Sequence, residues 1–554
     1  MESIAQKTAN LKPNKGASLK IEPGSAVIMP QAAPVPKALL DQIASDPKAL
    51  LSQIAPNPKA LPSQIAQDPY SLLDQIAKEG AQRPAAGITH TEQWKIETEG
   101  FIREEALFQK AVKRFWPDMP SLLEEITDGR KLGLIKGRLN LVMMATIAGL
   151  AFRASSMRDI SAKLRTREAI ANICSIVGEP IPESGHLPLW GSLLNALSKV
   201  PEGEIEALKQ KLAKEFLANK EIQRFAGAYI VIALDGTHLH RYYSIGPGRE
   251  KALFKIHNKG KEDEWIELYE EVLEAKAIIG GMAISIASLL IENPEDEEYD
   301  KQSCEISSSA AVIKAVRKAF PRAKIAIAAD SLYVSQDFMK EAIEAKAEFI
   351  IRYKKGSAPS IEKLYESLPS EGAFKLEQPI EGSSEPAIAE CGNGIIYKGI
   401  RISYARYTLP PGKDGIQKKF VFITSIRLTQ ENALEIIAMG RSRWAIENEG
   451  FNAQKNFFSL EHIYSYNAQA SKNIYNFIQI AHMIVQAMEL MEAEYVEAVS
   501  RSQLSSIVLE GFRSKVCDYG AEEPEKAVSA LRRKERSPKA SSPSPQAAKI
   551  ARSA

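Results

Sequence analysis

The chain has 554 residues, of which 45% are hydrophobic and 25% are charged, and such proportions are ordinary for a folded protein with two to four domains. The formal net charge is only +2. A globally basic surface is therefore excluded, and any contact with a polyanion must depend on a local basic patch. The cysteines lie far apart without a CxxC pair, which disfavours a disulfide framework or a zinc site and indicates a reducing compartment.

The amino terminus has no apolar segment of the kind found in secretory signals. The longest apolar stretches, near 139–152 and 277–291, are too short and too interrupted to span a bilayer. We expect no membrane partner, and these stretches predict a core helix and a pair of core strands. Gly280 and Gly281 mark a bulge or break within the second stretch.

Residues 1–85 are predicted to be disordered, and they contain four repeats of 11 residues that begin at Pro36, Pro47, Pro58 and Pro69. Each repeat has a small apolar face but is too short to form a stable helix alone, and proline interrupts the series. One interpretation is a duplicated tract without structure, and the other is a multivalent docking segment.

Residues 89–222 are predicted to form a helical domain, because apolar residues recur there at three- and four-residue spacing. A basic cluster surrounds the short helix predicted at 157–164. It could place its charges on phosphates as part of a helix-turn-helix, or it could be a solvated face between core helices. The cluster consists of Arg153, Arg158, Lys163, Arg165 and Arg167.

Two aspartates each follow an apolar run that is typical of a buried strand. Asp235 follows residues 231–234, and Asp330 follows residues 325–329. A carboxylate at the end of such a strand is held rigidly at the rim of the sheet. Two such groups, joined by a third acid from a packed helix, would form the all-oxygen site that Mg²⁺ prefers.

The third acid is predicted in the stretch 441–462, where Arg443, Glu447, Phe451 and Lys455 are spaced by four residues. On an α-helix these side chains would wind down one face, with Glu447 one turn from a guanidinium and two turns from an ammonium group. Alone, such a pattern is typical of a salt-bridged surface helix. Together with the two aspartates it matches the acid set needed for two-metal chemistry on phosphodiesters.

Residues 443–447, with the sequence Arg-Trp-Ala-Ile-Glu, followed by Lys455, resemble the R-W-x-I-E…K signature of DDE transposases of the IS4 type, which come from bacterial insertion sequences. LDGT at 234–237, KQSCE at 301–305 and ADSLY at 329–333 resemble further blocks of that family. The resemblance covers about residues 225–485.

Two positions depart from the family pattern. Gly440 stands where the signature begins with a tyrosine, and seven residues rather than six separate Glu447 from Lys455. Glu449 therefore competes with Glu447 as the third acid. We prefer Glu447, since its i+4 relation to Arg443 is kept and Glu449 lies on another face.

The resemblance implies an α/β protein with a ribonuclease H-like catalytic core, in which a mixed sheet is flanked by helices and carries a β-rich insertion, preceded by an α-helical domain. The order of predicted elements after residue 226 agrees with this core. The expected parts are the repeat segment 1–85, a helical DNA-end-binding domain at 89–222, the catalytic domain at 225–495 with its insertion at 355–424, a helical segment at 496–531 and a disordered basic tail at 532–554.

The family also implies the chemistry. Asp235, Asp330 and Glu447 would be catalytic and would hold two Mg²⁺ ions, or Mn²⁺, while Arg443 and Lys455 would bind DNA phosphates. The expected partners are DNA, as element ends and target, and a second copy of the chain on DNA. No small-molecule cofactor is expected, and the location would be the bacterial cytoplasm. The alternatives are a transposase-derived DNA-binding protein without cleavage activity and an interaction protein built on the repeats.

Deletion of residues 1–85 is expected to leave folding and cleavage in vitro unimpaired, because the repeats cannot form a core of their own. Thermal melting and a cleavage assay of the truncated protein measure both properties. Loss of a cooperative melt on truncation would contradict the prediction.

Overall fold

The computed structural model describes residues 106–517, apart from gaps at 132–134, 136, 243–251, 262–263, 294–300, 355–358, 360, 362, 364–372, 381–382, 413–414 and 493–499. The predicted repeat segment 1–85 and the predicted tail 532–554 lie outside the described residues. The described residues all belong to one compact unit of the chain.

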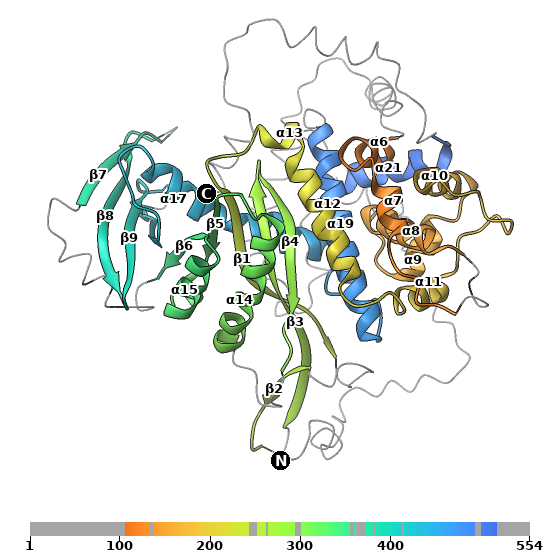
Figure 1. Ribbon diagram of the computed structural model, residues 1–554, viewed down its shortest axis with the longest axis horizontal. Helices are drawn as coiled ribbons and strands as arrows, with labels where there is room; N and C mark the ends of the chain where they lie inside the picture. The colour runs from red at the N-terminus through yellow and green to blue at the C-terminus, as the bar shows by residue number, and fades with distance from the viewer. Residues whose placement is uncertain are drawn as a thin grey trace, which may run out of the picture. The chain divides into compact units, whose positions relative to one another are not determined.

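The chain between residue 106 and the first strand is helical (Figure 1). Helix α8 is buried at all 13 positions and lies at the centre of this helical region, which agrees with the core helix predicted near 139–152. The side chains of Ser156 and Thr166 cap α9 and α10 by accepting hydrogen bonds from backbone N–H groups. The helices are α6 (Leu107–Phe115), α7 (Met119–Glu124), α8 (Leu139–Ala151), α9 (Met157–Lys163), α10 (Arg167–Val177), α11 (Trp190–Leu197), α12 (Glu204–Ala218) and α13 (Lys220–Gln223).

Ten described strands form one mixed sheet, in the order β2-β3-β1-β5-β6-β10-β9-β8-β7, with β4 paired to β3. Strand β1 is antiparallel to β3 and parallel to β5, which is parallel to β6. The strands are β1 (Ile230–Tyr242), β2 (Leu253–His257), β3 (Trp265–Ile279), β4 (Met282–Leu290), β5 (Ile325–Ala329), β6 (Glu348–Tyr353), β7 (Ala373–Gln378), β8 (Ala387–Tyr397), β9 (Ile400–Thr408) and β10 (Lys419–Thr424).

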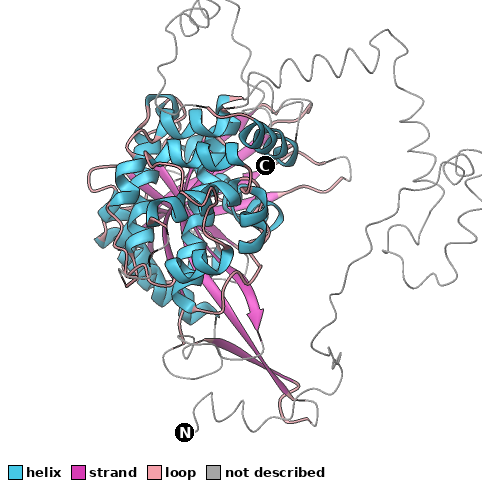
Figure 2. Cartoon of the chain, turned by 90° about the vertical axis from the view of Figure 1, so that its right-hand side faces the viewer, coloured by secondary structure: helices cyan, strands magenta, loops and turns pink. Residues whose placement is uncertain are grey.

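The strand pair predicted at 277–291 is confirmed, because β3 ends at Ile279 and β4 begins at Met282. Gly280 and Gly281 form the turn between them, and both adopt positive φ angles that favour glycine. The first part of β3 and all of β2 were not predicted. They form an extension that projects beyond the helices (Figure 2).

Strands β7 to β10 occupy the region predicted as a β-rich insertion. Strand β10 pairs with β6, so that these strands continue the same sheet. They lie on the opposite side of β5 from the helical region (Figure 1).

The remaining described helices, from α14 onward, pack on the sheet or on the helical region. Helices α14 and α15 pack against β3, β4 and β6, whereas α17 packs against β5 and β6 and the π-helix η5 packs against β1. These elements are α14 (Lys301–Ala319), η3 (a 3₁₀ turn, Ser331–Tyr333), α15 (Gln336–Glu344), α17 (Ala433–Ser442), η5 (Ile446–Asn452), α18 (Ala453–Phe457), α19 (Ala468–Met491) and α21 (Arg501–Ser514).

Helices α12 and α19 lie side by side along β4 and protect its outer edge. The side-chain oxygen of Gln486 accepts a hydrogen bond from the backbone N–H of Ala283 at 2.8 Å, and Glu206 accepts one from the N–H of Ser288 at 3.0 Å. Covering an edge strand in this way satisfies backbone groups that would otherwise be open to another strand.

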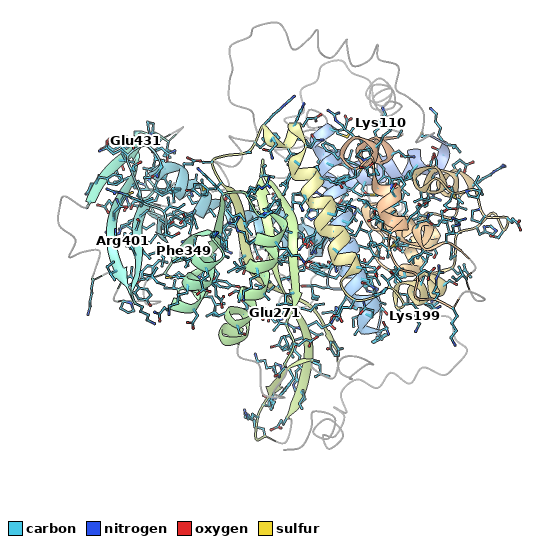
Figure 3. All side chains as sticks on the ribbon, in the orientation of Figure 1. Lys110, Lys199, Glu271, Phe349, Arg401 and Glu431 are labelled. Atoms are coloured by element: carbon cyan, nitrogen blue, oxygen red, sulfur yellow. The ribbon has the colours of Figure 1, made fainter. Side chains whose placement is uncertain are left out.

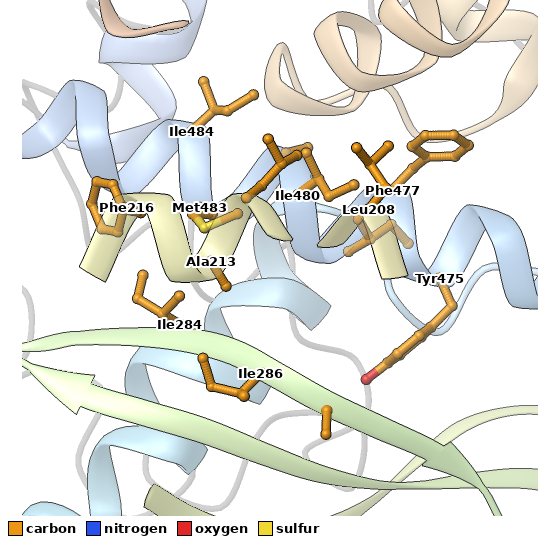
Figure 4. Close-up of a cluster of buried hydrophobic side chains, with 14 of the residues drawn as sticks. Leu208, Ala213, Phe216, Ile284, Ile286, Tyr475, Phe477, Ile480, Met483 and Ile484 are labelled. Atoms are coloured by element: carbon orange, nitrogen blue, oxygen red, sulfur yellow. The ribbon is translucent and has the colours of Figure 1, made fainter. Parts of the chain in front are cut away.

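Apolar side chains from α12, α19 and β4 fill the space between these elements (Figure 4). Phe216, Ile284 and Met483 meet there, and each is at most 2% exposed. This cluster is continuous with the core of the helical region, from Leu107 to Phe512. Among the described helices, none is both long and apolar enough to cross a bilayer.

Ile284→Ala is expected to reduce the free energy of unfolding by about 2–5 kcal/mol, because it removes buried methyl groups and leaves a cavity. Ile396→Ala, on a strand position that is 53% exposed, is the matched control and should change stability by no more than about 0.5 kcal/mol. Chemical denaturation of both variants measures the difference. Equal effects of the two substitutions would contradict the proposed core.

Candidate active site

The register of β1 and β5 places two aspartates at the same end of the sheet. The two strands run parallel, with Ala233 opposite Ala328, so that Asp235 and Asp330 each follow two residues later. The strands are almost completely buried up to this point. The apolar runs that predicted two strand-end acids therefore form neighbouring strands.

Asp330 is fixed by the turn that follows β5. Its backbone is extended and it caps η3, and its side chain accepts a hydrogen bond from the N–H of Leu332 at 2.8 Å. A short polar side chain that bonds the backbone two residues onward stabilises such a turn. The turn thereby orients the Asp330 carboxylate.

Glu447 comes from a π-helical segment between α17 and α18. Ile446 and Phe451 in this segment are buried against Ala233 and Ile278, whereas Glu447 is exposed. Arg443, Glu447, Phe451 and Lys455 do not lie on one continuous α-helix as expected, because residues 446–452 form a π-helix. A π-turn has a wider repeat than an α-turn, and π-turns occur often at functional sites.

Asp235 forms an ion pair with Arg443, with 2.8 Å between Oδ2 and Nη1. Both side chains are largely buried, at 21% and 14% exposure. Burial raises the pKa of the Asp235 carboxyl and Arg443 opposes this shift, whereas the charges of Asp330 and Glu447 raise the pKa further. Asp330 and Glu447 are thus each close enough to Asp235 to repel its charge, and Arg443 offsets part of that repulsion.

The competing acid Glu449 points to a different partner. Its carboxylate lies 3.6 Å from the guanidinium of Arg501 on α21. Glu447 is among the groups that raise the pKa of Asp235. This arrangement favours Glu447 as the companion of the two aspartates.

Lys455 lies in α18, and its ammonium group is 3.0 Å from the carboxylate of Glu461. Its side chain is 29% exposed. An exposed ion pair of this kind contributes little to stability and can exchange partners readily. Lys455 can therefore reach an anion in solution at low cost.

Steric crowding explains why position 440 is a glycine rather than the tyrosine of the family signature. A Cβ atom at this position would lie 2.7 Å from the ring of Phe422 and 2.9 Å from Ile350. Since α17 approaches β6 and β10 this closely, no larger side chain fits here.

Three arginines gather beside the acids, and sequence reasoning identified only one of them. Arg352 on β6 and Arg441 on α17 stand near Arg443, and Arg352 and Arg441 lie over the ring of Phe420 at 4.6 and 4.8 Å from its centroid. Burial lowers the pKa of Arg352, and the charges of Arg443 and Arg441 lower it further. Such clustering of guanidinium groups on an aromatic ring is suited to binding an anion.

A buried polar network connects the helix that follows the π-helix, α18, to β3 and α19. Lys276 on β3 donates to Gln479 on α19 at 2.6 Å, and Gln479 also accepts from Gln454 on α18 at 2.6 Å. Lys276 lies 3.4 Å from Glu274, and all four side chains are at most 2% exposed. Burial acts to raise the pKa of Glu274, but Lys276 and Lys209 lower it below its usual value. The π-helical segment therefore rests on a network of hydrogen bonds and one ion pair that links it to β3 and α19.

The oxygen donors of Asp235, Asp330 and Glu447 suit a hard divalent cation in their chemistry, and a cation would relieve the repulsion that raises the pKa of Asp235. Among the described residues, no group of three or more His, Cys, Asp or Glu side chains is already arranged to hold a metal ion. One of the three acids, Asp235, is instead paired with Arg443.

Residues 298–484 match the family model described as the transposase DDE domain. The matched segment contains Asp330, Glu447, Arg443 and Lys455, and Asp235 precedes it. The match supports a transposase of the DDE kind, and with it transposase activity and DNA as a partner. A search of curated proteins found no match to the chain.

Proposed function

We propose that this chain is an active transposase of the IS4 type, which binds the ends of an insertion sequence and catalyses metal-dependent DNA cleavage and strand transfer. The observation that carries the proposal is that Asp235 and Asp330 follow neighbouring parallel strands at the same end of the sheet, with the charge of Glu447 close enough to raise the pKa of Asp235. The family match over 298–484 supports the same reading.

The catalytic domain in this proposal is ribonuclease H-like and extends over 225–495. The order β4-β3-β1-β5-β6, with β1, β5 and β6 parallel and β3 antiparallel to β1, supports it. Strands β7–β10 within 355–424 would be the β-rich insertion. The helical region 89–222 would bind the element ends, and two copies of the chain would act together on DNA in the bacterial cytoplasm.

Asp235, Asp330 and Glu447 would hold two Mg²⁺ ions, or Mn²⁺ in their place. When bound, such ions would activate a water or a 3′-hydroxyl and stabilise the charge on the leaving oxygen. In this proposal the strand ends and the η3 turn would hold the two aspartates in place, and the packed π-helix would bring Glu447 to them; the Asp330 turn and the burial of Ile446 and Phe451 support this.

Arg443 has two successive roles in this proposal. In the free protein it neutralises Asp235. With DNA and metal bound, Asp235 would be a ligand of the cation. The planar guanidinium of Arg443 would then pair with a phosphate through two hydrogen bonds. Arg352 and Arg441 would extend this phosphate contact toward the β7–β10 side of the sheet.

Asp235→Ala, Asp330→Ala and Glu447→Ala are each expected to abolish strand cleavage while leaving end binding largely intact, because removal of one ligand loses the metal rather than the fold. A cleavage assay on the element's own ends and a gel-shift assay measure the two properties. Glu449→Ala is the matched control, because this residue pairs with Arg501. Cleavage by Glu447→Ala together with loss in Glu449→Ala would show that Glu449 is the third acid.

The alternative is a transposase-derived protein that binds DNA without cutting it. The departures at Gly440 and in the spacing of Lys455 raise this alternative. The close packing of Gly440 on Phe422 gives the first departure a steric cause that leaves the acids in place. End binding by the wild-type protein without cleavage in Mg²⁺ or Mn²⁺ would establish the alternative.

Arg352→Gln, Arg443→Ala and Lys455→Ala are each expected to weaken DNA binding for all end sequences and to reduce its salt dependence by about one counterion. Arg401→Gln, which alters an exposed charge on β9, is the control and should keep the wild-type salt slope. DNA-binding titrations at several salt concentrations measure the affinity and its salt slope for each variant. If the side chains only form structural ion pairs, the variants will melt earlier and keep the slope.

Arg443→Lys separates charge from geometry, because it keeps the positive charge but loses the planar fork. A large cleavage defect with nearly normal binding is expected. An Arg443→Ala protein that binds and cuts like the wild type would show that this side chain does not meet DNA.

A further inference from the structure

Glu305 is a buried acid that lies beneath both aspartate-bearing segments. It belongs to α14, within the KQSCE block, and is only 1% exposed. An acidic residue near the start of a helix commonly caps the helix or interacts favourably with its dipole. The structure instead brings its carboxylate against β1 on one side and against the η3 turn on the other.

The contact with the η3 turn is a hydrogen bond. The hydroxyl of Tyr333 donates to Oε2 of Glu305 at 3.0 Å, and Tyr333 is fully buried. Burial and the neighbouring Glu305 charge hold the pKa of the Tyr333 hydroxyl well above its usual value, and Asp235 and Asp330 add to this shift. The hydroxyl therefore remains a proton donor at any physiological pH.

Tyr333 is linked to Asp330 through the same turn. Its backbone N–H donates to the carbonyl of Asp330 at 3.2 Å, and its ring packs on Phe338 of α15. Because η3 is only three residues long, an anchored Tyr333 ring leaves Asp330 little freedom to rotate or shift. The Glu305–Tyr333 bond thus constrains the second aspartate.

The contact with β1 occurs at Gly236, the residue directly after Asp235. A Cβ atom on Gly236 would lie 2.5 Å from Oε1 of Glu305, so that only glycine permits this approach. Since side chains alternate along a strand, Gly236 faces α14 while Asp235 faces the π-helix. Glu305 therefore supports the first aspartate from the opposite face of the sheet.

Glu271 on β3 is the second buried acid at this place. A Cβ atom added to Gly236 would lie 3.2 Å from Oε1 of Glu271, and Glu271 is fully buried. In Figure 3 it lies in the β1–β3–β4 part of the sheet, apart from Phe349 and Arg401 on the other side. The underside of the acid site is thus strongly polar, unlike the apolar packing of α14 further along through Val312 and Val316.

We propose that Glu305 and Tyr333 are positioning residues that hold Asp235 and Asp330 in register for binding divalent cations. This inference rests on the proposed function of the three acids. Glu305 acts through the hydrogen bond to Tyr333 and through its packing at Gly236, and it need not touch metal or DNA. Outer-shell partners of this kind commonly change metal affinity by about 10- to 100-fold when they are removed.

The test is titration of the full-length protein with Mn²⁺ alone, followed by calorimetry or by electron paramagnetic resonance. Tyr333→Phe, which keeps the ring and removes only the hydroxyl, is expected to weaken Mn²⁺ binding by about 10-fold or more, and Glu305→Gln is expected to do likewise. The Mg²⁺ concentration needed for half-maximal cleavage should rise in parallel.

Tyr464→Phe is the matched control. The Tyr464 hydroxyl is also buried and donates to the carbonyls of Ala154 and Phe458 at 3.0 Å, away from the acids. If Tyr333 only stabilises the fold, Tyr333→Phe and Tyr464→Phe should lower the melting temperature similarly and both bind Mn²⁺ like the wild type. That result would overturn the inference.

The outcomes also separate this inference from the proposed function. A wild-type protein that neither binds Mn²⁺ nor cleaves DNA would overturn the proposed function and the inference together. Mn²⁺ binding that is lost in Asp235→Ala but is unchanged in both Tyr333→Phe and Glu305→Gln would overturn the inference alone. Weaker binding in both of these variants, with wild-type binding in Tyr464→Phe, would support it.

Discussion

The repulsion among three carboxylates at one end of the sheet is the constraint on which the rest of the structure depends. Asp235, Asp330 and Glu447 come from segments far apart in the sequence, and the burial of Asp235 makes its repulsion by the other two acids stronger than it would be in water. On one face of the sheet, the ion pair with Arg443 offsets part of this repulsion. On the other face, packed side chains hold the strand ends rigid. A site of this kind is poised to exchange the guanidinium for a cation.

The segment that carries Glu447 depends on a buried polar network rather than on apolar packing alone. Lys276, Gln479 and Gln454 connect β3 through α19 to the residue beside Lys455. Burying an ammonium group is costly unless it is paired and hydrogen-bonded, as Lys276 is by Glu274 and Gln479. Such a network adds directional contacts, which apolar packing lacks, and this agrees with a segment that must hold one acid in a defined place.

The sequence allowed the two strand-end aspartates to be predicted because each follows an apolar run that only a buried strand explains. It did not reveal the first part of β3, because Glu271, Glu274 and Lys276 interrupt the apolar pattern although all three are fully buried. The cluster of Arg352 and Arg441 was missed for a related reason, since residues 89 positions apart meet only through the pairing of β6 with β10 and the packing of α17. The π-turn was missed because the four-residue spacing of Arg443 and Glu447 is equally compatible with an α-helix.

Two glycines show how backbone approach, rather than side-chain chemistry, shapes both faces of the site. Gly440 lets α17 settle onto Phe422 and Ile350, and this brings Arg441 and Arg443 down toward the sheet. Gly236 lets the Glu305 carboxylate reach the backbone beside Asp235 from the other face. A larger residue at either place would meet these side chains at less than 3.0 Å, so that the side chains or the backbone would have to shift. The departure from the family signature at Gly440 is therefore compatible with an intact acid site, because the ring of Phe422 fills the space where a side chain at position 440 would lie.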